Sequence, residues 1–150
     1  MKKVVSSGAL DILKSLRLGF TATIQAVGGP VLSHKGTLMT FDDSHLIFAD
    51  ATSQALPQNA DVVVEVMDYF SLKGQRFRGK AQVIPATDSA TSYIAFYEER
   101  GMENVRARVK NFVLIDVHAN EPVSLTAQFS EKKQRLRAGT YYPLNNFWKF

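Results

Sequence analysis

The sequence contains no cysteine, and this absence removes several kinds of chemistry at once. Without cysteine the chain has no disulfide framework, no thiolate nucleophile and no cysteine-ligated metal site. Its three histidines, His34, His45 and His118, are scattered without the spacing of metal ligands, so we expect no metal site. A chain without cysteine also fits a reducing compartment.

Long hydrophobic runs are missing as well. The apolar stretches are of strand length, and none approaches the roughly 20 residues that a membrane-spanning helix needs. The start of the chain, Met1-Lys2-Lys3, is followed by polar Ser6 and Ser7 and lacks the apolar core of a signal peptide. We therefore expect a cytoplasmic protein that does not associate with membranes.

Common catalytic and nucleotide-binding motifs are also absent. The chain has no nucleophile elbow, no Walker loop and no dinucleotide-binding glycine fingerprint, and Gly28-Gly29 is typical of a hairpin turn. Carboxylates are few in the predicted strands, and no spacing joins two of them into an acid–base pair, so no catalytic residue is assigned. If the protein performs redox chemistry, a cofactor must supply the reactive centre.

The composition that remains is that of an ordinary globular domain. With 150 residues, 45% of them hydrophobic, the chain is long enough for one domain, residues 1–150, with its own core. The net charge of +4 gives a modest attraction to anions, which is consistent with phosphorylated cofactors, with nucleic acid or with no particular partner.

Alternation of apolar and polar residues predicts a mainly β protein with a few α-helices. The seven predicted strands cover residues 18–26, 31–41, 45–50, 61–69, 76–83, 111–118 and 123–130. Strand 45–50 is almost wholly apolar and is expected to be central. Ser6 and Ser7 favour a short N-terminal helix, and a helical excursion is predicted around 86–110, with Thr87 as a cap. Short turns between successive strands favour an antiparallel barrel.

Residues 31–41 form the most unusual of these strands. Their ends are apolar, but the centre carries Ser33, Lys35, Gly36 and Thr37. A glycine inside a strand marks a bulge or a place where a ligand or another backbone comes close. With a cation and two hydroxyl groups beside it, the pattern favours an anionic ligand.

Two further segments allow more than one interpretation. Arg76, Arg78 and Lys80 lie at alternate positions on one strand face, which is solvated, ion-paired or a nucleic-acid surface. Residues 131–150 form a C-terminal tail rich in aromatics, expected to pack on the barrel or on a dimer partner, or alternatively against a ligand.

The order of several short motifs resembles the pyridoxamine 5′-phosphate oxidase-like, FMN-binding split-barrel family. The resemblance covers roughly residues 10–118 and rests on Phe20-Thr21-Ala22-Thr23, Gly29-Pro30, Ser33-His34-Lys35-Gly36, Leu46-Ile47-Phe48-Ala49-Asp50, a Thr-Ser loop leading to Asn59, and Phe77-Arg78-Gly79-Lys80-Ala81. It implies a split antiparallel β-barrel of six to seven strands. It also implies a homodimer with one FMN at each of two sites on the subunit interface.

The same resemblance implies a set of cofactor-binding residues. The isoalloxazine would be lined by Ser33, His34, Lys35, Gly36, Thr37 and Leu38, with Lys35 near the ring or the phosphate. The ribityl and phosphate groups would be held by the loop Ala49, Asp50, Ala51, Thr52, Ser53 and Gln54, mainly through the two hydroxyls. Asn59 would close this loop, and Gln75 and Arg76 would touch the flavin across the dimer.

The chain departs from the family pattern in two places. Many members carry a lysine before the Asn59 position, where this chain has Gln54, Ala55, Leu56 and Gln58. Neutralisation of the phosphate would then fall to Lys35, Arg76 or Arg78, or FMN binding would be weak. The C-terminal arginine-containing signature of true pyridoxamine phosphate oxidases has no match, so the resemblance does not imply that activity.

The leading hypothesis is a flavin-dependent oxidoreductase, similar to flavin reductases, that passes hydride or electrons through N5 of FMN. NAD(P)H or another reduced compound would be the electron donor. One alternative is a flavin carrier or sensor without turnover. A second, less favoured, is a nucleic-acid-binding barrel that uses the face of Arg76, Arg78 and Lys80 together with aromatics of the tail.

Overall fold

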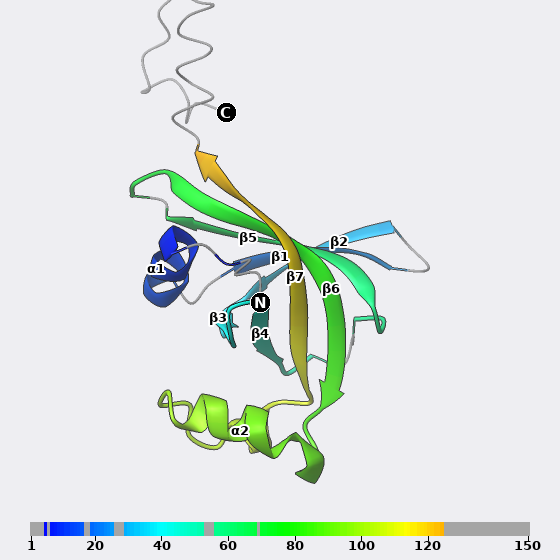
Figure 1. Cartoon of the computed structure of the whole chain (residues 1–150). Helices are drawn as coiled ribbons and strands as arrows, with labels where there is room; N and C mark the ends of the chain where they lie inside the picture. Colours follow the sequence, from blue (N-terminus) through cyan, green and yellow to red (C-terminus); the bar gives the residue numbers. More distant parts are fainter. Residues whose placement is uncertain are drawn as a thin grey trace, which may run out of the picture.

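Seven strands form a single antiparallel sheet in a computed structural model that describes residues 5, 7–16, 19–25, 29–52, 56–68 and 70–124 (Figure 1). The strands are β1 (Gly19–Gln25), β2 (Gly29–Lys35), β3 (Met39–Thr40), β4 (His45–Asp50), β5 (Ala60–Asp68), β6 (Lys73–Pro85) and β7 (Asn111–Ser124). Their order in the sheet is β2-β1-β5-β6-β7-β4-β3, so β2 and β3 are its two edges. The fold is mainly β, with a sheet that is not closed, as expected for a split barrel.

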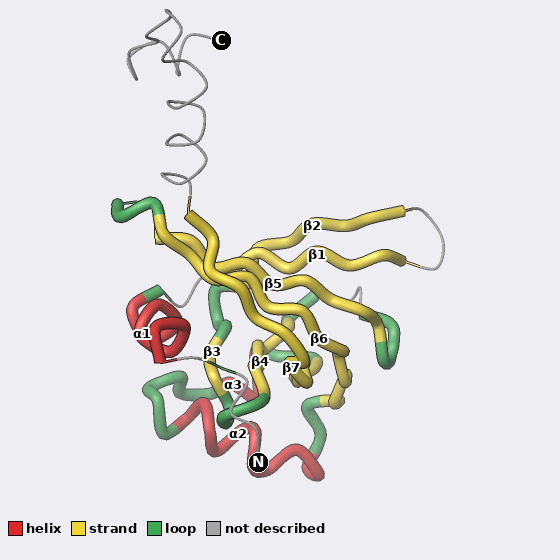
Figure 2. The backbone as a smooth tube through the Cα atoms, turned by 45° about the horizontal axis from the view of Figure 1, so that its top comes forward, coloured by secondary structure: helices red, strands yellow, loops and turns green. Residues whose placement is uncertain are grey.

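The helices of the described part, red in Figure 2, lie at two places. Helix α1 (Ser7–Ser15) packs beside the sheet, and the excursion between β6 and β7 comprises a 3₁₀ turn, η1 (Asp88–Ala90), α2 (Thr91–Glu98) and α3 (Val105–Arg108). The helical excursion predicted around 86–110 is therefore confirmed, and α2 lies beneath the ends of β6 and β7 that it connects (Figure 1). Among the described residues, no helix is both long and apolar enough to cross a membrane.

Apolar side chains gather in two clusters on opposite faces of β4. Leu46 and Phe48 belong to the main core beneath α1, whereas Ile47 belongs to a second core beneath α2. Successive residues of a strand point to opposite faces, so an almost wholly apolar strand must be covered on both sides. The double burial expected of residues 45–50 is present, but β4 is second from an edge of the sheet and not central.

The predicted strand 31–41 is wrong as a single element. It divides into β2 and β3, which lie at opposite edges of the sheet, with a turn at Gly36 and Thr37 between them. The predicted alternation holds along β2, whose side chains are alternately half-buried and exposed, and fails after the turn, where Leu38 and Met39 are both buried. This segment therefore crosses between the two edges, which is a tertiary property that local alternation does not report.

Proline occurs in three of the described strands: Pro30 in β2, Pro85 at the end of β6 and Pro122 in β7. Pro30 lies within β2, paired with Ile24, because an edge strand has one side that needs no partner. The predicted strands 111–118 and 123–130 are one strand, β7, as far as Ser124, and Pro122 lies inside it. Around Pro122, β7 pairs only with β6, because the pairing of β4 with β7 ends at Asp116. Residues 125–130 and the tail 131–150 lie outside the described residues.

The long pairing of β6 with β7 contains a bulge between Arg78 and Gly79, and glycine is required there. A Cβ at residue 79 would lie 2.4 Å from the backbone oxygen of Asp116. We expect Gly79→Ala to lower the free energy of unfolding by about 1–3 kcal/mol, since backbone atoms must move to admit the methyl group. Urea unfolding would measure this. Gly8→Ala is the control. A Cβ added at Gly8 would meet no atom within 4 Å outside its own helix backbone and chain neighbours, so this substitution should not be destabilising.

Candidate functional site

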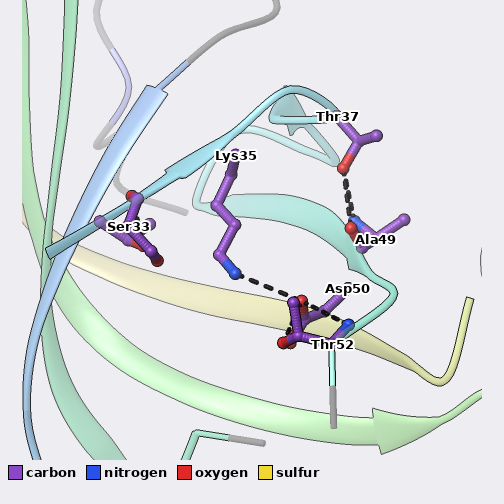
Figure 3. Close-up of polar contacts among 7 residues, drawn as sticks. Ser33, Lys35, Thr37, Ala49, Asp50 and Thr52 are labelled. Atoms are coloured by element: carbon purple, nitrogen blue, oxygen red, sulfur yellow. Dashed lines mark hydrogen bonds and ion pairs between the residues drawn. The ribbon is translucent and has the colours of Figure 1, made fainter. Parts of the chain in front are cut away.

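A buried ion pair joins the ends of two strands that are distant in the sequence. Lys35 is the last residue of β2 and Asp50 the last of β4, and their Nζ and Oδ1 atoms lie 3.2 Å apart (Figure 3). The side chains are only 13% and 4% exposed. The Lys35 ammonium also lies 5.1 Å from the centre of the Phe48 ring, within the range of a cation–π contact. Lys35 therefore holds the edge strand β2 to β4.

Asp50 accepts hydrogen bonds from three different kinds of donor. Besides the ammonium of Lys35, the Thr52 backbone N–H donates to Oδ1 at 3.3 Å, and the Thr52 hydroxyl donates to Oδ1 at 2.9 Å and Oδ2 at 3.1 Å. Bonding two residues ahead is a local preference of aspartate in turns. An ammonium, an amide and a hydroxyl that converge on one point form an anion-binding set. Here the anion is the chain's own carboxylate.

The turn after Lys35 is held in place by Thr37. Its hydroxyl donates to the carbonyl of Ala49 at 3.0 Å and accepts from the Ala49 N–H at 2.9 Å. The hydroxyl of Tyr97, on α2, donates to the Thr37 carbonyl at 3.0 Å. Burial raises the pKa of the Tyr97 phenol well above its usual value, so this donor stays protonated at neutral pH. These bonds fix the crossing segment against β4 and so position Lys35 opposite Asp50.

The remaining predicted site residues near the turn are divided between different environments. Ser33 shares the half-buried face with Lys35, and its hydroxyl bonds to that of Thr21 at 3.0 Å. His34 points to the exposed face of β2, away from Lys35. Leu38 is fully buried in the main core and does not line an open surface. Gly36 and Ala51 are exposed, and the predicted contacts of Ser53 and Gln54 lie outside the described residues.

Strand register places Gln75 and Arg76 well away from Lys35 within one chain. Lys35 pairs with Gly19 and Val66 with Gln75, and the β1–β5 register, continued by one residue beyond the Phe20–Glu65 pair, sets these four in one row across the sheet. Three strand spacings separate the ends of this row, about 14 Å. Arg76 lies in the next row, on the opposite face. Gln75 is 9% exposed, and its side-chain oxygen has no hydrogen-bond partner among the described residues.

The row of cations on β6 is paired with carboxylates. Arg76 lies 2.7 Å from Glu65, Arg78 lies 3.1 Å from Glu121, and Lys80 lies 2.8 Å from Asp61. The hydrogen bond that Arg76 donates to the Glu65 carboxylate raises the pKa of Arg76, and the hydrogen bond that Glu121 accepts from Arg78 lowers the pKa of Glu121. This agrees with the ion-paired interpretation of the strand face and leaves it with little unpaired positive charge.

A second polar cluster was not anticipated from the sequence. His45 lies with Nδ1 2.8 Å from Asp42 and Nε2 4.0 Å from Asp116, at a groove of about 500 Å³. Asn59, expected to close the flavin loop, also lines this groove, and its N–H donates to the Ala81 carbonyl at 2.9 Å. The spacing of Asp42 and His45 across a turn could have indicated their pairing, whereas the Asp116 contact depends on register. Within the described residues, no group of side chains is arranged to hold a metal ion.

Comparison with solved structures identifies the fold. No family model and no curated protein matches the sequence. A "putative pyridoxamine 5′-phosphate oxidase" from Lactobacillus delbrueckii matches with a TM-score of 0.64 and 21% identity, over 80% of this chain and 95% of that one. An FMN-binding protein from Syntrophomonas wolfei matches with a TM-score of 0.56 and 13% identity, over 78% of this chain and 84% of that one. The heme storage protein HutZ from Vibrio cholerae matches with a TM-score of 0.56 and 15% identity, over 81% of this chain and 94% of that one.

The chain therefore has the pyridoxamine 5′-phosphate oxidase-like fold, which confirms the resemblance found in the sequence. Each identity is below 25%, so the likeness concerns the fold. Proteins with this fold include one that binds FMN and one that stores heme. The chemistry of the site must consequently be argued from the residues of this chain.

Proposed function

We propose that the protein binds FMN beside the Lys35–Asp50–Thr52 cluster and acts as a flavin-dependent oxidoreductase. The observation that carries this proposal is the Lys35–Asp50–Thr52 cluster around the buried Asp50 carboxylate, which joins residues from the two segments that the family resemblance assigns to the cofactor. The likeness to an FMN-binding protein of the same fold supports it.

The ammonium group of Lys35 suits the isoalloxazine ring of the cofactor. The Lys35 ammonium, on a side chain only 13% exposed, would favour the electron-rich, reduced form of a flavin ring that lies nearer to it than to Asp50. Bound FMN would supply hydride or electron transfer through N5. Lys35 would orient the ring, and Thr52 would lie toward the ribityl and phosphate groups. NAD(P)H is the first electron donor to test.

We further propose that a second copy of the chain completes the site. Within one chain, the backbones of Gln75 and Lys35 are separated by three strand spacings, about 14 Å along the sheet, so the two residues are not direct neighbours. The edge strand β2 presents Leu32, which is 70% exposed, as an apolar contact for a partner. In a homodimer with flavin at the interface, the partly exposed Arg76 of one copy would approach the flavin beside Lys35 of the other, with the buried Gln75 next to it on the same strand.

FMN titration of the purified protein tests the proposal directly. Bound flavin should give absorbance near ~450 nm that persists through dialysis, whereas heme would absorb near ~400 nm. Anaerobic NADH or NADPH should then bleach the flavin colour. Bound flavin without bleaching by any donor would favour a carrier or sensor, and failure to retain flavin would refute the proposal.

Substitution of Lys35 locates the site. We expect Lys35→Ala to weaken FMN binding by about tenfold or more, since it leaves the buried Asp50 carboxylate unpaired beside the cofactor. Arg108→Ala, an exposed position on α3, should change it less than about twofold. Flavin fluorescence quenching measures both, with circular dichroism to verify folding. Equal effects of the two substitutions would mean that the site is elsewhere.

A further inference from the structure

The cations assigned to a flavin phosphate are all engaged within the chain. Arg76 is paired with Glu65, Arg78 with Glu121 and Lys35 with Asp50. The first two pairs are partly exposed, on the sheet face opposite Lys35. The third is buried, and its carboxylate belongs to the proposed cofactor site itself.

Asp50 is bonded as a bound phosphate oxygen would be. It is 97% buried and accepts from the Lys35 ammonium, the Thr52 N–H and the Thr52 hydroxyl. A buried carboxylate is stable only with such compensation, because burial of an unpaired charge is costly. The same donors cannot also neutralise a phosphate, and a dianion placed beside Asp50 would be repelled by it.

We propose that Asp50 is a resident anion that occupies the phosphate-binding donors, so that this site gains little from the phosphate of its ligand. Resting on the proposed function, this makes Asp50 a specificity-determining residue. The flavin is held mainly by its ring and ribityl chain, and riboflavin binds nearly as well as FMN. Replacement of Asp50 by a neutral side chain frees Lys35 and Thr52 for the phosphate.

Relative affinity for two flavins tests this without any substitution. The dissociation constants of the wild-type protein for FMN and riboflavin should agree within about fivefold, whereas a phosphate held by a free lysine would favour FMN by about a hundredfold. Fluorescence quenching at fixed ionic strength gives both constants. A wild-type preference for FMN of about a hundredfold or more overturns the inference and leaves the proposed function intact.

Asp50→Asn is the decisive variant, and it should raise the preference for FMN over riboflavin by about tenfold or more. Lys110→Met is the matched control, because its backbone N–H donates to the Asp50 carbonyl while its side chain is exposed. The control should leave the preference unchanged. An unchanged preference in Asp50→Asn would overturn the inference, and an equal gain in Lys110→Met would do so too.

Inorganic phosphate provides a measurement that does not depend on flavin. Against chloride of equal ionic strength, phosphate should raise the melting temperature of Asp50→Asn and leave that of the wild type and of the Lys35→Met/Asp50→Asn double variant unchanged. Equal stabilisation of wild type and Asp50→Asn contradicts the inference. If neither protein binds flavin but Asp50→Asn alone responds to phosphate, the inference on Asp50 stands and the proposed function fails.

Discussion

Replacement of Lys35 by methionine is expected to lower the free energy of unfolding by about 3–5 kcal/mol, the usual cost of leaving a buried charge unpaired. Asp50 is 3% exposed and would keep only the two donors of Thr52. Methionine retains most of the length of lysine, so the loss of packing against Phe48 is small. The loss of stability in Lys35→Met would therefore come from the unpaired charge of Asp50 and not from a cavity.

Chemical denaturation of Lys35→Met, Asp50→Asn and the double variant measures the coupling between the two residues. The double variant should recover most of the lost stability, since replacing a buried ion pair by neutral groups is often neutral or stabilising. A single Lys35→Met variant that loses less than about 1 kcal/mol would mean that the pair is solvated, in the range of surface salt bridges. That outcome would also remove the basis for Asp50 as a resident anion.

Tyr97 is the second position with a large expected effect. It is fully buried, packs against Phe112 with ring centres 5.7 Å apart, and is the largest fully buried side chain of the described core. Tyr97→Ala should cost about 3–5 kcal/mol through the cavity it leaves. Tyr97→Phe retains the ring and should cost about 1–3 kcal/mol, because the Thr37 carbonyl loses its donor.

The same residue should make stability depend on alkaline pH. Burial raises the folded-state pKa of Tyr97 above its ordinary value, so the unfolded chain releases this proton first as the pH rises. Stability is fully present below about pH 10 and then falls by about 1.4 kcal/mol per pH unit until the folded-state pKa is reached.

Urea unfolding at pH 9 to 11.5 tests this, with Tyr97→Phe as the comparison. The phenylalanine variant should lack this part of the decline, so the two proteins should become more alike in stability as the pH rises. Parallel decline of both proteins across the range would show that Tyr97 titrates as an ordinary exposed phenol.

Local patterns were sufficient for most strands and for the helical excursion. Residues 19–25 alternate strictly, and residues 60–68 are rich in β-branched side chains, so neighbouring residues alone predicted β1 and β5. Alternation also predicted that Ser33 and Lys35 share one face of β2 while His34 faces the other way. Alternation likewise predicted that Arg76, Arg78 and Lys80 share one face of β6. Each of these features depends on spacing within a single element.

The partner of each charged group required the tertiary structure. Lys35 and Asp50 are 15 residues apart, on strands that are not neighbours in the sheet, and no local pattern joins them. Strand register places Arg76 opposite Glu65 on β5 and Glu121 on β7, and Arg76 forms ion pairs with both. The described residues contain seven strands, the number predicted for the chain: the predicted strand 31–41 is divided into β2 and β3, and the predicted strands 111–118 and 123–130 meet in β7 as far as Ser124.

Composition and periodicity, which are local properties, by themselves determined a mainly β fold without cysteine chemistry, and the order of short motifs along the chain carried the resemblance to the pyridoxamine 5′-phosphate oxidase-like fold. Only the tertiary structure decided that residues 31–41 cross between the two edges of the sheet and that Lys35 meets a buried carboxylate there. The physical reason is that the stability of a buried charge depends on what surrounds it in space, and those surroundings come from distant parts of the chain.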